Sequence, residues 1–428
     1  MKVSIFIVLF SILLASQAEL VQVIQLARHG ARAPNSFEYI PNQYPEKNGE
    51  LTPLGLVQQY FLGQEMRKRY VEDHPFLSET FDPSEVVIKS SWKNRTIWSA
   101  LAFTNGLYPQ ESGTWFHNPY AESFPIEELL PLKKREKIVS REDVEKIKID
   151  EQFAREVVDV IKMDGDLYFH AIKDENCPPA EKIIDELKKS REILEMEKYL
   201  SLTLYPLLAS GINAHLGFDL IKPEVLTIKK AKSVLDSYRC NTFHRKSYPE
   251  IDETLLKLLK MTRAFYAYKI TLVDDLVKSV SGSKLLGEFL QYTQALLKGE
   301  APPKFIFYSA HDTTLEILFS IFLLETKFHF EEQYNIIPFA STLSIEIHKE
   351  KEDSDDPSDL ETRDVYYVKM FYNDEPQLIK WCLGYTCPLE QFHRILEHYI
   401  VPNIHNFCNP EKLEDLIDCE DDSLCVKF

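Results

Sequence analysis

The sequence predicts an α/β protein, with a mostly parallel sheet flanked by helices and a helical cap domain inserted into it. Segments typical of strands and helices alternate near both ends of the 428-residue chain, and a long block of helical periodicity separates them. The composition, with 44% hydrophobic and 27% charged residues, is that of a folded globular protein. The length allows two domains, each with a core of its own.

The N-terminus predicts a signal peptide at residues 1–18. Lys2 precedes an apolar run from Val3 to Ala15, and Ser16-Gln17-Ala18 supplies small residues for cleavage before Glu19. The run is too short for an ordinary membrane span. We therefore expect a secreted or lysosomal, lumenal protein with no membrane span once the signal peptide is removed.

Four segments in the N-terminal third carry strand or helix signals. Leu20–Ala27 is rich in β-branched residues and is typical of a strand, and Glu85–Ser90 is expected to be a second, shorter one. A helix is expected over Thr52–Tyr70, because threonine is a good N-cap and the proline after it suits the first helical position. Another helix is expected over Asn94–Leu107, with the asparagine as its cap.

Residues 140–278 have mostly helical periodicity. The clearest amphipathic stretches are Leu187–Leu200 and Thr254–Leu276. This block predicts the cap domain, at residues 151–274. Residues 19–150 and 275–428 are expected to form the α/β domain together.

The C-terminal third returns to alternating strands and helices. A buried strand and a helix are expected first, then two strands paired across an acidic loop, then a last helix. Their ranges are Lys304–Ser309, Asp312–Leu323, Ser341–His348 paired with Val365–Tyr372 across Glu350–Asp364, and a helix from Pro388.

The acidic composition argues against nucleic acid as a partner. Forty-nine Lys and Arg oppose 67 Asp and Glu, a formal charge of −18, whereas phosphate backbones are bound by clustered positive charge. None of the 13 glycines forms a phosphate-cradling Gly-x-Gly-x-x-Gly or Gly-x-x-x-x-Gly-Lys loop. No His-Glu-x-x-His or Cys-x-x-Cys pair is present, so we expect no metal and no cofactor.

Seven cysteines agree with an oxidising compartment, and their odd number leaves at least one unpaired within the chain. Short spacing favours Cys382–Cys387 and Cys419–Cys425 as local disulfides.

Polar clusters follow three of the predicted strands. The motif Arg28-His29-Gly30-Ala31-Arg32-Ala33-Pro34 ends the first strand, Arg95 follows the second, and His311-Asp312 follows the third. The carboxyl ends of parallel strands meet at the edge where open α/β sheets bind ligands. Arginine side chains match the paired oxygens of phosphate, and the amides of a helix beginning at Asp312 attract anions to the same space. The sequence therefore predicts an anion site at this edge.

Each cluster also has a structural explanation. Arg28 and Arg32 would serve as surface charges, Asp312 as a helix N-cap and His311 as a packing residue. Asn94-Arg95-Thr96 is the only N-glycosylation sequon in the chain. We expect Asn94 to be mostly unmodified, because a glycan beside the arginine would crowd the substrate. Three such clusters at three strand ends favour the functional interpretation.

These residues resemble the histidine acid phosphatases, the two-domain secreted and lysosomal branch of the histidine phosphatase superfamily. The resemblance covers nearly the whole mature chain. The matching segments are the Arg28–Pro34 motif, Leu51–Gly55, Arg95-Thr96, Ala310–Thr314 and Cys382–Phe392.

The resemblance implies an acid phosphatase that hydrolyses small phosphate monoesters through a phosphohistidine intermediate. In this family pattern His29 is the nucleophile and Asp312 protonates the leaving group. The residues implied to hold the phosphate are Arg28, Arg32, Arg95 and His311. The mechanism requires no metal, and a homodimer is left open.

Two departures from the family pattern are visible. Lys89-Ser90-Ser91-Trp92 replaces an Arg-Ser-Thr-Asp run and is expected to alter the pocket near Arg95. Thr342 stands where related animal enzymes carry a bridging cysteine, which leaves Cys240 as the expected free thiol. The resemblance further implies a Cys177–Cys408 disulfide.

Physical chemistry constrains the two reacting groups. Nearby arginines disfavour a further positive charge, so the pKa of His29 is expected below its reference value of about 6.5. The same arginines lower the pKa of Asp312, whereas a bound phosphate dianion raises it and favours proton donation.

Two other functions fit part of the sequence. A phytase or other inositol-phosphate phosphatase would share the first motif, although Thr313-Thr314 is more typical of broad-specificity acid phosphatases. A catalytically inactive secreted binding protein would keep the arginines but would have lost His29 or Asp312, and both are present.

Overall fold

The computed structural model describes residues 18–36, 43–115, 129–132, 140–163, 166–172, 176–217, 221–323, 337–353 and 362–409. Nearly all of the expected signal peptide and the expected Cys419–Cys425 disulfide lie outside these residues. Within the described ranges, no helix has the length and apolar character needed to cross a membrane.

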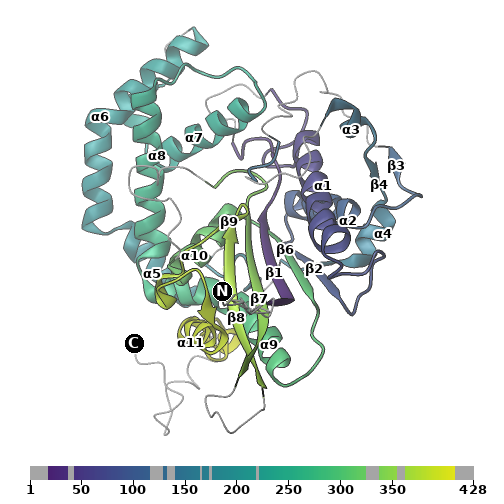
Figure 1. Ribbon diagram of the computed structural model, residues 1–428. Helices are drawn as coiled ribbons and strands as arrows, with labels where there is room; N and C mark the ends of the chain where they lie inside the picture. Colours follow the sequence, from purple (N-terminus) through teal and green to yellow (C-terminus); the bar gives the residue numbers. More distant parts are fainter. Residues whose placement is uncertain are drawn as a thin grey trace, which may run out of the picture.

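A mixed sheet of eight strands forms the centre of the molecule (Figure 1). Its order is β10–β8–β7–β1–β6–β2–β5, and β9 pairs with β8. The parallel half consists of β1 (Glu19–Arg28), β6 (Phe305–Ala310), β2 (Val86–Ser90) and β5 (Val158–Val160). The antiparallel half consists of β7 (Thr342–Asp353), β8 (Thr362–Tyr372), β9 (Glu375–Pro376) and β10 (Cys387–Pro388). The α/β class is confirmed.

The C-terminal hairpin is longer than the sequence suggested. β7 and β8 stay paired from Leu343 opposite Tyr372 to Asp353 opposite Thr362. Both ends of the acidic stretch expected as a loop are therefore strand, at residues 350–353 and 362–364. Cross-strand ion pairs offset part of its charge, because Asp364 accepts from both Lys349 and Lys351 at 2.7 Å.

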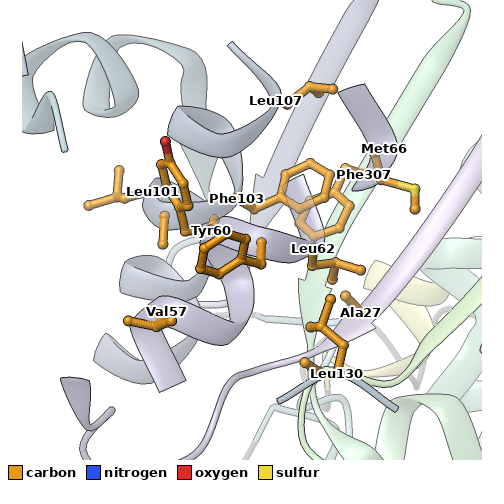
Figure 2. Packing of buried hydrophobic residues seen from close by; sticks show 14 of the residues in the cluster. Ala27, Val57, Tyr60, Leu62, Met66, Leu101, Phe103, Leu107, Leu130 and Phe307 are labelled. Atoms are coloured by element: carbon orange, nitrogen blue, oxygen red, sulfur yellow. The ribbon is translucent and has the colours of Figure 1, made fainter. Parts of the chain in front are cut away.

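Helices cover both faces of the sheet. α1 (Pro53–Arg67) and α2 (Asn94–Leu107) cover one face, where Phe103 stacks on Phe307 with ring centroids 3.7 Å apart (Figure 2). α9 (Asp275–Leu297), α10 (Asp312–Phe322) and α11 (Leu389–Tyr399) cover the other face. Alternate residues of β6 point to the two cores, as the two-residue period of a strand requires.

Helix ends agree only partly with the sequence signals. Thr52 caps α1 as predicted, and its hydroxyl accepts from the N–H of Gly55. Asn94 does not cap α2, because Lys93 occupies the N-cap position and Asn94 is the first helical residue. The expected helix over 187–200 is broken between α5 (Pro178–Lys188) and α6 (Arg191–Leu216).

A separate group of helices forms a core of its own beside the sheet (Figure 1). Its main members are α5, α6, α7 (Ile228–Phe243) and α8 (Glu253–Ala267), which a π-helical turn over Tyr268–Leu272 separates from α9. The expected boundary at residue 151 is too early, because β5 pairs with β2 and completes the edge of the main sheet. We place the helical insertion after residue 160.

The remaining elements are short. They are a π-helical turn at Lys68–Asp73, β3 (Thr114–Trp115), α3 (Arg141–Glu145), β4 (Lys148–Ile149), α4 (Glu151–Val157), 3-10 turns at Pro223–Val225 and Lys380–Cys382, and α12 (Ile404–Phe407).

Two disulfides are formed, both as predicted. Cys177–Cys408 joins the start of the helical insertion to the end of α12, and Cys382–Cys387 closes a short loop before α11. Among the described cysteines, Cys240 is the free one, and it is buried.

Candidate active site

Strand register places the predicted clusters together. Arg28 of β1 lies opposite Ala310 of β6, and Ser90 of β2 lies opposite Ser309. Because these strands are parallel, the residues that follow them emerge at one edge. His29 and His311 are therefore neighbours, with ring centroids 5.7 Å apart.

The turn after β1 is fixed by close backbone packing against α1. A Cβ on Gly30 would lie only 2.2 Å from the carbonyl oxygen of Gly55, so a larger residue at this position would push the helix away. The N–H of Gly30 donates to Ser99 Oγ of α2, and the N–H of Ala31 donates to Gln58 of α1. Both helices therefore hold the motif in place.

One ring nitrogen of His29 is hydrogen-bonded to the backbone, and the other can act as a nucleophile. Its Nδ1 lies 2.8 Å from the carbonyl oxygen of Gly30 and donates to it, because a carbonyl can only accept. The Nε2 lone pair is thus left for attack. Burial and the charges of Arg95, Arg28 and Arg32 hold the pKa of His29 well below its ordinary value. The neutral, nucleophilic form is therefore favoured, as expected.

Arg28 and Arg32 are held by carboxylates. The Arg28 guanidinium lies 3.1 Å from Asp312, and Arg32 binds Asp236 through both terminal nitrogens at 2.8 and 3.2 Å. Arg95 stands free of such a pair in the described part of the chain, and burial together with Arg32 lowers its pKa to about 10.

Each of these arginines keeps a buried donor for a ligand. Within the described residues, the Nε atoms of Arg28, Arg32 and Arg95 are buried without a hydrogen-bond partner. Buried donors without partners are unfavourable. Oxygens of a bound phosphate would satisfy them.

A cavity of about 310 Å³ opens beside these groups. Five of the predicted residues line this cavity: His29, Arg32, Arg95, His311 and Asp312. Arg28 is fully buried beneath, in contact with Asp312. The structure therefore brings all six predicted site residues together.

Asp312 is the first residue of α10, and His311 occupies the N-cap position. The predicted structural alternative, that Asp312 is a helix cap, is thus wrong. Burial raises the pKa of Asp312, but Arg28, Arg263 and Arg239 outweigh burial and hold the pKa well below its ordinary value. In the absence of substrate this carboxyl is ionised.

His311 is fixed by the segment that departs from the family pattern. Its Nε2 lies 2.9 Å from Ser91 Oγ, which also bonds Thr96 Oγ1 at 2.7 Å. The neighbouring Trp92 contacts the ring of His170. Ser91 and Trp92 therefore support two histidines that line the cavity, His311 and His170.

His170 was not predicted from the sequence. It lines the cavity, its ring contacts His311 at 5.0 Å, and its Nδ1 lies 2.7 Å from the carboxylate of Asp166. Asp166 is itself fixed by the N–H groups of Tyr168 and Phe169, each at 3.0 Å. The pair thus holds one more imidazole rigidly against the site.

The helical insertion supplies a further wall that the sequence analysis missed. Four charged residues of α7 line the cavity: Lys229, Lys232, Asp236 and Arg239. Their spacing of three, four and three residues places them on one helical face, and that spacing is the signal that could have identified them. Arg263 of α8 completes this wall.

Comparisons with known proteins agree with this geometry. The profile of the histidine phosphatase superfamily (branch 2) matches residues 19–373. The chain belongs to this superfamily. The matched range begins at the first residue of β1 and contains all six predicted site residues.

Several acid phosphatases are similar over most of the chain. Human prostatic acid phosphatase is 26% identical over 396 residues, which cover 88% of this chain and 85% of that protein. Lysosomal acid phosphatase of Xenopus laevis is 26% identical over 417 residues, covering 94% and 82%.

Solved structures share the fold. Hafnia alvei phytase in complex with tartrate superposes with a TM-score of 0.58 at 16% identity, covering 90% of this chain and 98% of that one. The phytase of Klebsiella sp. ASR1 gives 0.58 at 14% identity, covering 90% and 95%. At these identities the likeness concerns the fold alone.

Proposed function

We propose that this protein is a secreted or lysosomal acid phosphatase that hydrolyses phosphate monoesters through a phosphohistidine at His29. One observation carries the proposal. The imidazole is buried, held by Gly30 so that Nε2 is available, and surrounded by three arginines with unpartnered buried donors. The disulfides, and the name of the lysosomal relative, support the compartment.

The first step transfers the phosphoryl group to the enzyme. His29 Nε2 attacks phosphorus and forms the N–P bond as the bond to the ester oxygen breaks. Arg28, Arg32 and Arg95 stabilise the charge on the equatorial oxygens of the transition state. Asp312 gives its proton to the departing oxygen, so an alcohol leaves rather than an alkoxide.

The second step returns the enzyme to its starting state. Water attacks the phosphohistidine while the Asp312 carboxylate takes one of its protons. The N–P bond breaks, inorganic phosphate forms, and His29 regains its neutral imidazole. Asp312 holds this proton while phosphate is bound and releases it when phosphate leaves, because the arginines around the empty site favour the ionised carboxylate.

A His29→Ala variant tests the nucleophile. We expect turnover of p-nitrophenyl phosphate to disappear while vanadate still binds, because the arginines that carry binding are unchanged. A phosphoenzyme trapped by rapid quenching should vanish with the imidazole. The exposed His398, changed to alanine, is the matched control and should retain activity. Activity within tenfold of wild type in His29→Ala would refute the assignment.

Hydrolysis of inositol phosphates is a second candidate function. The cavity wall carries Lys229, Lys232, Arg239 and Arg263 besides the phosphate-binding arginines, and such a wall favours a substrate with several anionic groups. A hydrolysis panel at pH 5 with p-nitrophenyl phosphate, sugar phosphates, phosphotyrosine and phytate would rank the two. No hydrolysis of any of them would instead indicate an inactive binding protein.

A further inference from the structure

A second, largely buried carboxylate lies on α10, one helical turn beyond Asp312. Glu316 is four residues after it, so both side chains leave the same face of the helix. Its carboxylate forms an ion pair of 2.5 Å with Arg263 Nη2 of α8, and the two side chains are only 13% and 19% exposed. The proposed mechanism uses neither residue.

Arg263 interacts electrostatically with both carboxylates. It lines the cavity together with Asp312, and its positive charge is one of those that lower the pKa of Asp312. Its direct partner, however, is Glu316. The ion pair holds the guanidinium at the second turn of α10 rather than the first.

The surroundings of Asp312 hold an excess of positive charge. The charged and titratable groups that interact with Asp312 are Arg28, His29 and Arg32 at the end of β1, Arg95 of α2, Arg239 of α7, Arg263 of α8 and Glu316 of α10. Like charges disfavour each other's ionisation, so a negative Glu316 makes it easier for Asp312 to hold a proton. The coupling is reciprocal, because Asp312 also raises the pKa of Glu316.

We propose that Glu316 is a positioning residue for the proton donor: by binding Arg263 one turn along α10, it keeps that guanidinium off Asp312 and offsets its charge. The inference rests on the proposed role of Asp312 as proton donor. Glu316 acts only through Arg263 and Asp312 and does not contact the substrate. Its effect should therefore appear only where proton donation matters.

Three variants test the charge relation: Glu316→Gln, Arg263→Gln and the double variant. Glu316→Gln leaves Arg263 uncompensated, so Asp312 should lose its proton at lower pH. The basic limb of the single-turnover pH profile for an alkyl phosphate should move down by about one pH unit, which is about tenfold in rate on that limb. p-Nitrophenyl phosphate, whose leaving group needs little protonation, should change less than about threefold.

The other two variants give opposite and compensating results. Arg263→Gln removes a positive charge near Asp312 and should move the same limb to higher pH. The double variant should restore the wild-type limb to within about 0.3 pH units, because both members of the pair are then neutral. Restoration by a second mutation is a result that loss of packing alone does not produce.

A purely structural role predicts a different pattern. Equal losses on both substrates, a lower melting temperature and no restoration in the double variant would overturn the proposal. Should Glu316→Gln fail to fold, Arg263→Lys and Arg263→Gln decide the matter, since only loss of the charge should shift the limb. If Asp312→Asn affects both substrates equally, the fault lies in the proton-donor assignment instead.

Discussion

In the proposed mechanism, Asp312 has to carry a proton in a cavity lined by several arginines. Its carboxylate lies 3.1 Å from Arg28, and the arginines around it outweigh the effect of burial on its pKa. A bound phosphoryl dianion neutralises the same arginines. The carboxyl therefore gains its proton with the substrate, and the state of this one residue depends on whether the cavity is filled.

An Asp312→Asn variant should separate substrates by their leaving groups. Asparagine keeps the shape but has no proton to donate. Alkyl phosphates should lose roughly 10²–10⁴-fold in single-turnover rate, and p-nitrophenyl phosphate far less. Melting temperatures of both proteins show whether folding is intact. Equal losses on the two substrates would remove Asp312 from the mechanism.

In the proposed mechanism, His29 is expected to set the acid side of the pH profile. Attack needs the neutral imidazole, so activity is lost as pH falls through the pKa of His29 in the folded enzyme. Because burial and Arg95 hold that pKa well below its ordinary value, kcat/KM should persist far into the acid range. The profile from pH 3 to 7 measures this, after correction for ionisation of the substrate. A half-loss near pH 6.5 would contradict the buried, arginine-surrounded site.

At the residue scale the sequence identifies the reacting groups but not their supports. His29, Arg95 and Asp312 could be predicted because each follows a recognisable strand. The spacing of the α7 charges could have placed Asp236 on a charged helical face, but not against its partner Arg32, 204 positions away. His170 could not be predicted, because its role arises from a contact with His311 at a distant strand end. Such contacts leave no local pattern.

At the scale of elements, α7 is part of the site as well as of the helical insertion. Asp236 binds Arg32 at 2.8 Å and also accepts from the N–H of Asn35 at 2.9 Å. One carboxylate thus joins the helix to the motif that follows β1. Arg32 is therefore held by the helical insertion as well as by the segment that follows β1.

Asp236→Asn should weaken both stability and substrate binding. Breaking a largely buried pair while its partner stays buried costs about 3 kcal/mol. KM for p-nitrophenyl phosphate should rise about tenfold, because Arg32 is no longer held in position. Glu142→Gln is the matched control, since the Glu142–Lys146 pair is exposed to solvent and should contribute little to stability. An unchanged KM would show that Arg32 needs no such support.

The start of α2 bears on the glycosylation sequon. Asn94 is exposed and its side-chain amide donates to Glu50 at 3.4 Å, while the next residue, Arg95, lines the cavity. A glycan would displace the Glu50 loop, in which Gly49 lies beside Arg95. We expect active enzyme to be mostly unmodified there, and intact-mass analysis measures the occupancy. Full occupancy in active enzyme would contradict this.

At the scale of the whole molecule, the two disulfides differ in the length of chain that they enclose. Cys177–Cys408 closes a loop of 231 residues in sequence separation, and Cys382–Cys387 one of 5. On the chain-entropy model the long loop should contribute about 5 kcal/mol and the short one about 2 kcal/mol. Double serine variants of each pair, compared by urea unfolding, measure the difference. A larger loss from the short loop would argue against chain entropy as the cause.

The sequence predicts the elements better than their order in space. Strand signals such as those at Leu20–Ala27 come from local alternation, and the structure confirms them. The position of β1 between β6 and β7 does not follow from any local signal, nor does the addition of β5 to the far edge. Strand order is decided by burial of both sheet faces, which depends on all the helices at once.

The place of β1 in the sheet also determines when this strand can find its partners during synthesis of the chain. Its two neighbours begin only at Phe305 and Thr342, so the strand that leads to His29 leaves the ribosome long before either exists. Until then its apolar residues stay uncovered and open to wrong pairing. The helical insertion, with its own core, can assemble in the meantime. A chain cut short before β7 would therefore fail to build the pocket at all, rather than build a weaker one.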